Sequence, residues 1–223
     1  MDIEAVAVLT LAVLISLALL AYVYLFLPSQ LERRLRETTK AFSLAVELRF
    51  PSHRGVTEVV VRRARLMGEQ LGLSGKRLAN LEIAAQLRDI GLCSIPYSLV
   101  NQRPMSEWTA AERVVYESHP DVSASMLELI PSLKNLAAIV RSHHVHFDGS
   151  SGGLYPAGTN IPIESRILKV LTDFTWIEQT SGSAEAYAQM AALSGKSFDP
   201  MVVEAFLRVL TSEGAGELHR AIA

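Results

Sequence analysis

The chain has 223 residues, of which 49% are hydrophobic, and its 21 basic and 23 acidic residues give a formal net charge of −2 at pH 7. A chain of this length accommodates one globular domain and an accessory segment. The balanced charge, without a long basic run, excludes a surface for nucleic-acid polymers. The single cysteine, Cys93, excludes an intramolecular disulfide.

The first expected element is a helix over residues 5–27, which contain no charged residue. At 1.5 Å per residue it reaches about 34 Å, enough to cross a hydrocarbon core of about 30 Å. A cleaved signal peptide is the alternative, but the acidic start, the length of the run and the lack of a small-residue cleavage site argue against it.

Basic residues follow this segment at Arg33, Arg34, Arg36 and Lys40. Under the positive-inside rule they place the rest of the chain in the cytoplasm. The sequence therefore predicts a single-pass anchor over residues 1–28 in the inner (cytoplasmic) membrane, with the N-terminus outside.

Residues 29–50 are expected to form a juxtamembrane helix. Its apolar positions alternate between spacings of four and three, which is a heptad-like pattern. We call these positions the heptad stripe: Leu31, Leu35, Thr38, Phe42 and Ala45. Two arrangements remain open, because the stripe could pack against the chain's own domain or join two copies of the chain as a homodimer.

From residue 51 onward the pattern predicts helices and no strand. The expected helices cover residues 56–72, 76–90, 109–119, 120–129, 133–144, 163–180, 184–193 and 200–213. Thr109 and Glu112 have capping-box spacing, and Asp199 is placed as the N-cap of the last helix. The fold class is therefore all-α, with one domain over residues 51–213 and a C-terminal tail over residues 214–223.

Histidines are concentrated in two short segments of this domain. They are His119, which precedes a proline, and His143, His144 and His146 in RSHHVHFDG. Imidazoles and carboxylates at separated helix ends can build a dinuclear metal centre, which activates a bridging water and binds a phosphodiester. The available carboxylates are Asp89, Asp148 and Asp173. The alternative is structural, because histidines near helix C-termini also interact favourably with the helix dipole.

Five segments, in order, resemble the motifs of the HD-GYP family, a branch of the HD hydrolase superfamily associated with cyclic di-GMP hydrolysis. ELRFPSHRGVTEVV resembles ELRDPYTxGHSERV, AAQLRDIGLCSIP resembles AALLHDIGKIGIP, and TAAERVVYESHPDVSASML resembles TPEEWEIMKRHPEIGAEIL. The stretch from AAIVRSHHVHFDG to ESRILKVLTDF resembles VAxIIxxHHERWDG to xARILAVADxF, and LSGKSFDPMVVEAFL resembles xxGxxFDPxVVxAFL. The matches run from residue 47 to about residue 209.

The resemblance implies seven metal-ligand positions in this chain. They are Val56, Arg88, Asp89, His119, His143, His144 and Asp173. The last five keep a residue that can bind a metal, whereas Val56 and Arg88 replace two histidines. Leu92 also replaces the lysine of HDIGK, and the family's basic segment after Asp173 is absent.

A complete two-metal site is therefore not expected. Each lost imidazole removes a bond to the metal, and the guanidinium of Arg88 is expected to pair with Asp89 and to repel a divalent cation. Two alternatives remain. One is a single divalent ion (iron, manganese or zinc) at a reduced site of His119, His143, His144 and Asp173; the other is no metal and a hydrogen-bonded remnant. His53 is not expected to replace Val56, because a shift of three residues at the helix start would require rebuilding.

The sequence thus predicts a membrane-anchored, HD-GYP-like signalling or scaffold module with impaired catalysis, acting through a protein partner in cyclic di-GMP signalling or through residual ligand binding. One alternative is an active metal-dependent phosphodiesterase for cyclic di-GMP or a related nucleotide. Another is a purely structural dimer module.

Overall fold

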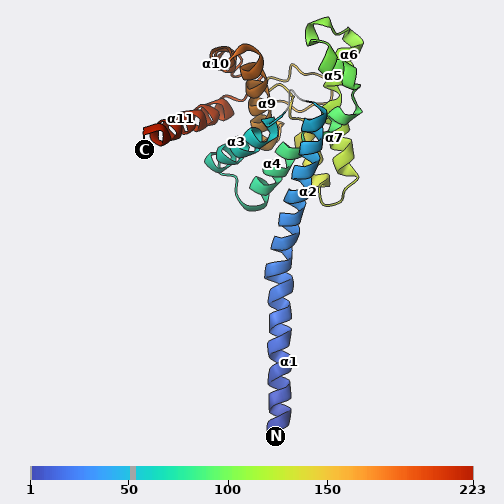
Figure 1. Cartoon of the computed structure of the whole chain (residues 1–223), viewed down its shortest axis with the longest axis vertical. Helices are drawn as coiled ribbons and strands as arrows, with labels where there is room; N and C mark the ends of the chain where they lie inside the picture. The colour runs from blue at the N-terminus through green and yellow to red at the C-terminus, as the bar shows by residue number, and fades with distance from the viewer. Residues whose placement is uncertain (1, 51–53, 223) are drawn as a thin grey trace. The chain divides into compact units, whose positions relative to one another are not determined.

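The computed structural model describes residues 2–50 and 54–222, with side chains described up to residue 213. Its α-helices (Figure 1) are α1 (Ile3–Ala21), α2 (Leu27–Arg49), α3 (Val56–Gln70), α4 (Gly75–Leu87), α5 (Tyr97–Gln102), α6 (Ala110–Glu117), α7 (His119–Glu128), α8 (Ala137–Arg141), α9 (Ile163–Ser181), α10 (Ser183–Ala192) and α11 (Pro200–Ile222). Short 3₁₀ or π turns are η1 (Tyr22–Phe26), η3 (Ile90–Ser94), η4 (Met105–Glu107), η5 (Lys134–Leu136) and η6 (Gly158–Asn160). Strand-like pairing within the described residues is limited to one bridge between Ser194 and Phe198, so the all-α prediction is confirmed.

The chain divides into two compact units, residues 1–41 and 42–223. The first unit consists of α1, η1 and the beginning of α2. By length and composition this continuous helix is apolar enough to cross a membrane, a property that signal sequences share.

The second unit begins within α2 and uses only one face of that helix for packing. Val46 and Phe50 are buried, whereas Phe42 and Ala45, the part of the heptad stripe in this unit, are exposed. The arrangement in which this part of the stripe packs against its own domain is therefore wrong. The pairing of two copies stays a prediction.

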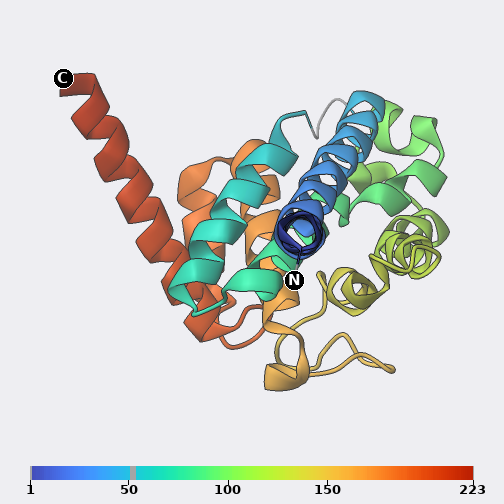
Figure 2. The same cartoon turned by 90° about the horizontal axis from the view of Figure 1, so that it is seen from below.

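Helix α9 is the central element of the second unit. It packs against α3 and α10, and α3 packs in turn against α4, which runs beside it in both views (Figures 1 and 2). Residues on every side of α9 are buried, including Ile167, Leu168, Val170, Leu171 and Phe174. Because its buried residues lie on every side of the helix, α9 is held inside the core and provides a rigid support for the residues that it carries.

A second apolar cluster fixes the end of α2 to the segment that follows Asp89. Its buried members are Val46, Phe50, Leu92, Ile95, Leu99 and Trp108. Glu47, on the same turn of α2, caps the start of α3 by accepting hydrogen bonds from the backbone N–H groups of Gly55 at 3.0 Å and Thr57 at 2.8 Å. The start of α3, where Val56 lies, is therefore held by α2.

The predicted helix boundaries are confirmed in some places and wrong in others. The capping box of Thr109 and Glu112 forms as predicted. The helix predicted over residues 76–90 ends at Leu87, the helix predicted over 133–144 ends at Arg141, and α11 continues past residue 213 to Ile222. The early end of α8 matters most, because it releases the following histidines from helical geometry.

Candidate metal centre

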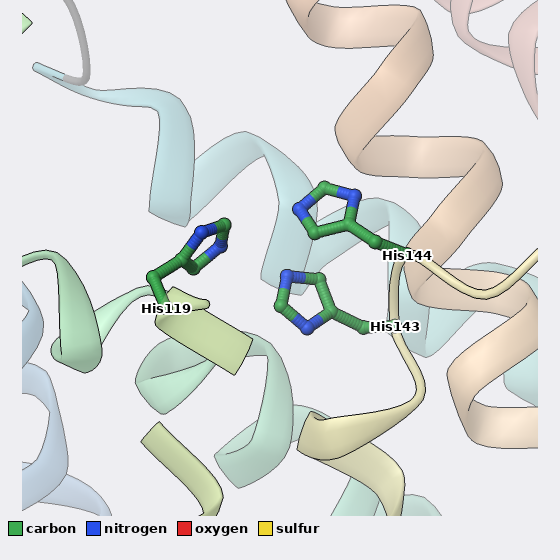
Figure 3. A group of neighbouring side chains, drawn as sticks. All are labelled: His119, His143 and His144. Carbon is green, nitrogen blue, oxygen red and sulfur yellow. The ribbon is translucent and has the colours of Figure 1, made fainter. Parts of the chain in front are cut away.

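Three histidines from two segments meet in the second unit. His119 is the first residue of α7, and His143 and His144 follow the end of α8. Their rings lie side by side (Figure 3), and one ring nitrogen of each lies within 4.8 Å of the other two. The structure thus brings together three of the predicted metal ligands.

Two of these rings are oriented by backbone carbonyls. The Nδ1 atom of His119 lies 2.8 Å from the carbonyl oxygen of Tyr116, and Nδ1 of His143 lies 2.6 Å from that of Val140. A carbonyl can only accept, so Nδ1 donates and the Nε2 atoms carry free lone pairs. Both Nε2 atoms are buried and have no hydrogen-bond partner. Histidines that bind metals are commonly held in this way, so the residues fit a divalent cation.

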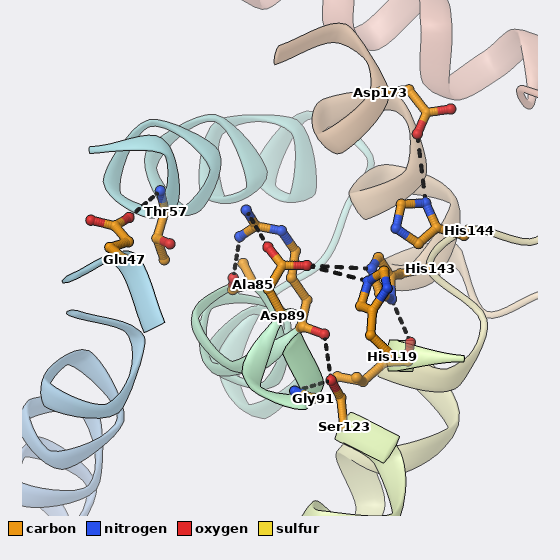
Figure 4. A network of polar contacts seen from close by, with 12 residues as sticks. Glu47, Thr57, Ala85, Asp89, Gly91, His119, Ser123, His143, His144 and Asp173 are labelled. Carbon is orange, nitrogen blue, oxygen red and sulfur yellow. Dashed lines mark hydrogen bonds and ion pairs between the residues drawn. The ribbon is translucent and has the colours of Figure 1, made fainter. Parts of the chain in front are cut away.

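Arg88 and Asp89 form the ion pair that the sequence predicts. A terminal nitrogen of Arg88 lies 2.9 Å from Oδ2 of Asp89, and the other donates to the carbonyl oxygen of Ala85 at 2.6 Å (Figure 4). The side chain of Arg88 is only 1% exposed. Burial raises the pKa of Asp89, but the guanidinium of Arg88 and the neighbouring His119 outweigh it and hold that pKa well below its usual value. Asp89 is therefore ionised at neutral pH.

The other oxygen of Asp89 faces the histidine cluster. Its Oδ1 lies 3.6 Å from Nε2 of His119 and 3.8 Å from Nε2 of His143, too far for hydrogen bonds. One carboxylate oxygen thus contacts the guanidinium of Arg88, and the other faces the Nε2 atoms of His119 and His143. A bound cation between them would satisfy all three atoms.

Asp173 forms an ion pair with Lys169 and is not part of the group of three histidines. Its Oδ2 lies 2.6 Å from Nζ of the buried Lys169, and its Oδ1 lies 3.6 Å from Nδ1 of His144. Burial raises the pKa of Asp173, but His144 and Lys169 together lower it overall. Burial also lowers the pKa of His144, which favours the neutral ring.

The assignment of Asp173 to the family's acidic position is one residue out of register. In the family pattern VADxF the acid stands two residues before the phenylalanine, whereas Asp173 directly precedes Phe174. Counted from Phe174, the acidic position falls on Thr172. One residue rotates a helical side chain by about 100°, which agrees with Asp173 lying outside the group of three histidines.

Two of the three positions predicted to have lost a histidine or lysine, Val56 and Leu92, are apolar in the structure. Val56 is the first residue of α3 and lies against the site, and Leu92 is 1% exposed in the second apolar cluster. His53 lies outside the described residues. Asp148 is exposed and accepts from the backbone N–H of Ser150 in the loop, so it is not part of the cluster.

A cavity of about 300 Å³ opens beside the histidine cluster. It is lined by Val56, Arg88, Asp89, Met105, Tyr116, His144, Thr172, Asp173, Thr175, Trp176, Ile177, Gln179, Gln189, Leu193 and Phe198. Most of the α9 and α10 residues in this wall were not predicted. Trp176 and Ile177 lie three and four residues after the predicted site residue Asp173. This helical spacing is a signal that could have found these two, because residues three and four apart share one helix face.

Ser123 is a further residue that sequence reasoning missed. It is fully buried on α7, and its hydroxyl donates to the carbonyl oxygen of Arg88 and accepts from the backbone N–H of Gly91, both at 2.8 Å. This one side chain joins the helix that begins with His119 to the turn that carries Arg88 and Asp89. It therefore fixes the distance between the histidine cluster and the ion pair.

Comparisons with known proteins agree with this architecture. Residues 27–202 match the HD domain family. The chain is 34% identical, over 194 residues, to the cyclic di-GMP phosphodiesterase response regulator RpfG of Xanthomonas campestris, covering 81% of this chain and 49% of that protein. It is 30% identical, over 154 residues, to a cyclic di-GMP phosphodiesterase of Thermotoga maritima, covering 64% of this chain and 40% of the relative.

A solved structure shares the fold. A cyclic GMP-AMP-specific phosphodiesterase of V. cholerae superposes with a TM-score of 0.61 at 20% sequence identity, covering 79% of this chain and 49% of that one. The chain thus spans about half the length, or less, of the proteins it matches. The family match covers most of the chain and includes the histidine cluster and the Arg88–Asp89 pair, so the chain belongs to the HD domain family and is related to its cyclic di-GMP phosphodiesterases.

Proposed function

We propose that this protein is a membrane-anchored member of the HD domain family with impaired catalysis, which acts in signalling rather than in turnover. The observation that carries the proposal is the position of Arg88. Its guanidinium pairs with Oδ2 of Asp89 and is almost completely buried. A fixed positive charge therefore lies on the side of Asp89 that faces away from the histidines.

This position is incompatible with a second metal ion at Asp89. A two-metal phosphodiesterase site needs two cations about 3.5–4 Å apart to hold the attacking and leaving oxygens. Arg88 supplies no free lone pair and repels a divalent ion. Val56 offers no ligand from α3, and Leu92 brings no charge near a phosphate.

A reduced, one-metal site remains compatible with the cluster. His119, His143 and His144 would hold the ion, with Oδ1 of Asp89 on the same side. When bound, such an ion polarises a phosphoryl oxygen and acidifies a water. The protein's own contribution is to hold the Nε2 atoms of His119 and His143 in place through the two carbonyl contacts.

A second candidate function is an active metal-dependent phosphodiesterase for cyclic di-GMP or a related nucleotide. The observation that favours it is the preset histidine cluster, because three protein ligands and one open position are typical of catalytic zinc sites. The replaced residues at 56, 88 and 92 favour the impaired module instead.

Turnover and metal content separate the two functions. For the purified full chain in detergent we expect at most one iron, manganese or zinc ion per chain, and no hydrolysis of cyclic di-GMP above the level of His143→Ala. His146→Ala, in the loop outside the cluster, serves as the matched control for metal content. Clear turnover that disappears in His143→Ala and persists in His146→Ala would establish the active phosphodiesterase.

The same assay includes Arg88→His. We expect no turnover from this variant, because Val56 and Leu92 remain unchanged and a two-metal site still lacks a ligand. Full recovery of hydrolysis by this one substitution would contradict the role that we assign to Arg88.

The remaining part of the proposal concerns the membrane and partners. Residues 1–28 would anchor the chain once in the inner membrane, with the N-terminus outside and the HD domain in the cytoplasm. Residues 29–50 would join two copies through the heptad stripe, whose members Phe42 and Ala45 are exposed. A protein partner in cyclic di-GMP signalling would then bind the paired domains and respond to their conformation.

Cys93 provides a direct test of this topology, because it is the single cysteine and is exposed. We expect a membrane-impermeant maleimide to label Cys93 only after spheroplasts are lysed. In a Cys93→Ser background, Asp2→Cys should show the opposite result and react in intact spheroplasts. Labelling of Cys93 before lysis would place the domain outside and overturn the proposed orientation.

A further inference from the structure

The cavity beside the histidine cluster offers no unpaired fixed positive charge on its described wall. Arg88 is the one lysine or arginine among the described lining residues, and it is paired with Asp89. Asp173, the second carboxylate of the wall, is paired with Lys169. In the metal-free chain, a phosphate group entering this space would lose its hydration and face two carboxylates, which is unfavourable without a free cation.

The remaining wall is suited to a flat ring. Tyr116, Trp176 and Phe198 contribute aromatic side chains, and Val56 and Leu193 contribute aliphatic ones. Aromatic side chains favour stacked or edge-on contact with a second ring system. The cavity volume of about 300 Å³ is at the lower end of the range for small-molecule sites.

Neutral polar side chains also line the cavity. The hydroxyl oxygens of Thr172 and Thr175 are buried and have no partner in the structure. Such groups are costly to leave unpaired, so a ligand that pairs with them gains affinity. Gln179 and Gln189 add two primary amides; that of Gln189 already donates one hydrogen bond to Glu185 at 2.7 Å and keeps a second N–H and its carbonyl oxygen.

We propose that this cavity binds an uncharged heteroaromatic molecule of the nucleobase or nucleoside class and discriminates against phosphate-bearing nucleotides. The aromatic residues cover the faces of the ring, and the threonine hydroxyls and glutamine amides pair with its edge. This inference rests on the proposed function, because it names the ligand class that a non-hydrolysing domain would sense.

Calorimetry on the full chain in detergent, after dialysis against a chelator, tests the ligand class. The probes are guanosine and adenosine, with 5′-GMP and cyclic di-GMP as their charged counterparts. We expect at least one nucleoside to bind at least about tenfold more tightly than either nucleotide. Absence of nucleoside binding, or tighter binding of a nucleotide, would overturn the proposal.

Thr175→Val tests whether the buried hydroxyl contacts the ligand. The change is nearly isosteric and removes an unpaired polar atom, so the melting temperature of the free protein should not fall. Nucleoside affinity should fall about three- to tenfold, the value of one hydrogen bond. Thr211→Val is the control, because Thr211 is exposed on α11 and its hydroxyl bonds only to the carbonyl oxygen of Leu207.

The outcomes separate this inference from the proposed function. An unchanged nucleoside affinity in Thr175→Val, or an equal loss in Thr211→Val, would remove the assigned contact and with it this inference. Hydrolysis of cyclic di-GMP in the turnover assay would instead overturn the proposed function. Failure of nucleosides to bind in a protein without turnover leaves the impaired module intact and rejects only the ligand class.

Discussion

Gly91→Ala is expected to lower the free energy of unfolding by about 3 kcal/mol or more, at the upper end of what overpacking costs. A Cβ atom at this position would lie 2.3 Å from the carbonyl oxygen of His119 and 2.7 Å from the backbone nitrogen of Ser123. Both obstacles are backbone atoms of α7, so no side chain can move aside. The turn after Asp89 and the start of α7 would have to separate, which would displace His119 from the histidine cluster.

Urea unfolding of the full chain in detergent, followed by tryptophan fluorescence, measures this effect. Both tryptophans, Trp108 and Trp176, lie in the HD domain and report only its unfolding. Gly152→Ala is the control: Gly152 has φ of 66° and no atom within 4 Å of an added Cβ, so the substitution costs only the backbone strain of about 1–2 kcal/mol. Equal losses in the two variants would show that the contact between Gly91 and α7 is not as close as described.

Local sequence patterns predicted the elements of this fold better than their exact ends. The all-α class and the capping box at Thr109 depend on residues close in the chain, and both are confirmed. The end of α4 depends on the approach of α7 to Gly91, which joins residues about thirty positions apart. No local pattern encodes such a contact.

The candidate site, too, was predictable only in part. The ion pair of Arg88 with Asp89 could be predicted from adjacent opposite charges in a buried segment, and it is present in the structure. The approach of His119 to His143 and His144 could be predicted from the order of the motifs, and it is present as well. On α9, motif order alone predicts the acid at Asp173, whereas the spacing to Phe174 places the family's acidic position at Thr172. The partner of Asp173 is Lys169, one turn earlier on the same helix.

The second large effect on stability is expected at the ion pair of Arg88 and Asp89. Asp89→Leu is expected to lower the free energy of unfolding by about 3–5 kcal/mol, because it leaves the guanidinium of Arg88 buried without a counter-charge. Arg88 keeps one acceptor, the carbonyl oxygen of Ala85, and its Nε atom is already buried without a partner. Neither can replace a carboxylate in a side chain that is 1% exposed.

The double variant Arg88→Met, Asp89→Leu decides whether this loss comes from the unpaired charge. Replacing a buried ion pair by apolar side chains of similar volume is often neutral or stabilising, so the double variant should regain most of the stability that Asp89→Leu loses. Substitutions at independent sites have additive effects on stability to within about 0.3–0.5 kcal/mol. The coupling energy from this double-mutant cycle should be several times larger than that. Additive losses would mean that Arg88 and Asp89 act separately. In that case the proposed role of Arg88 in excluding a second metal ion would lose its support.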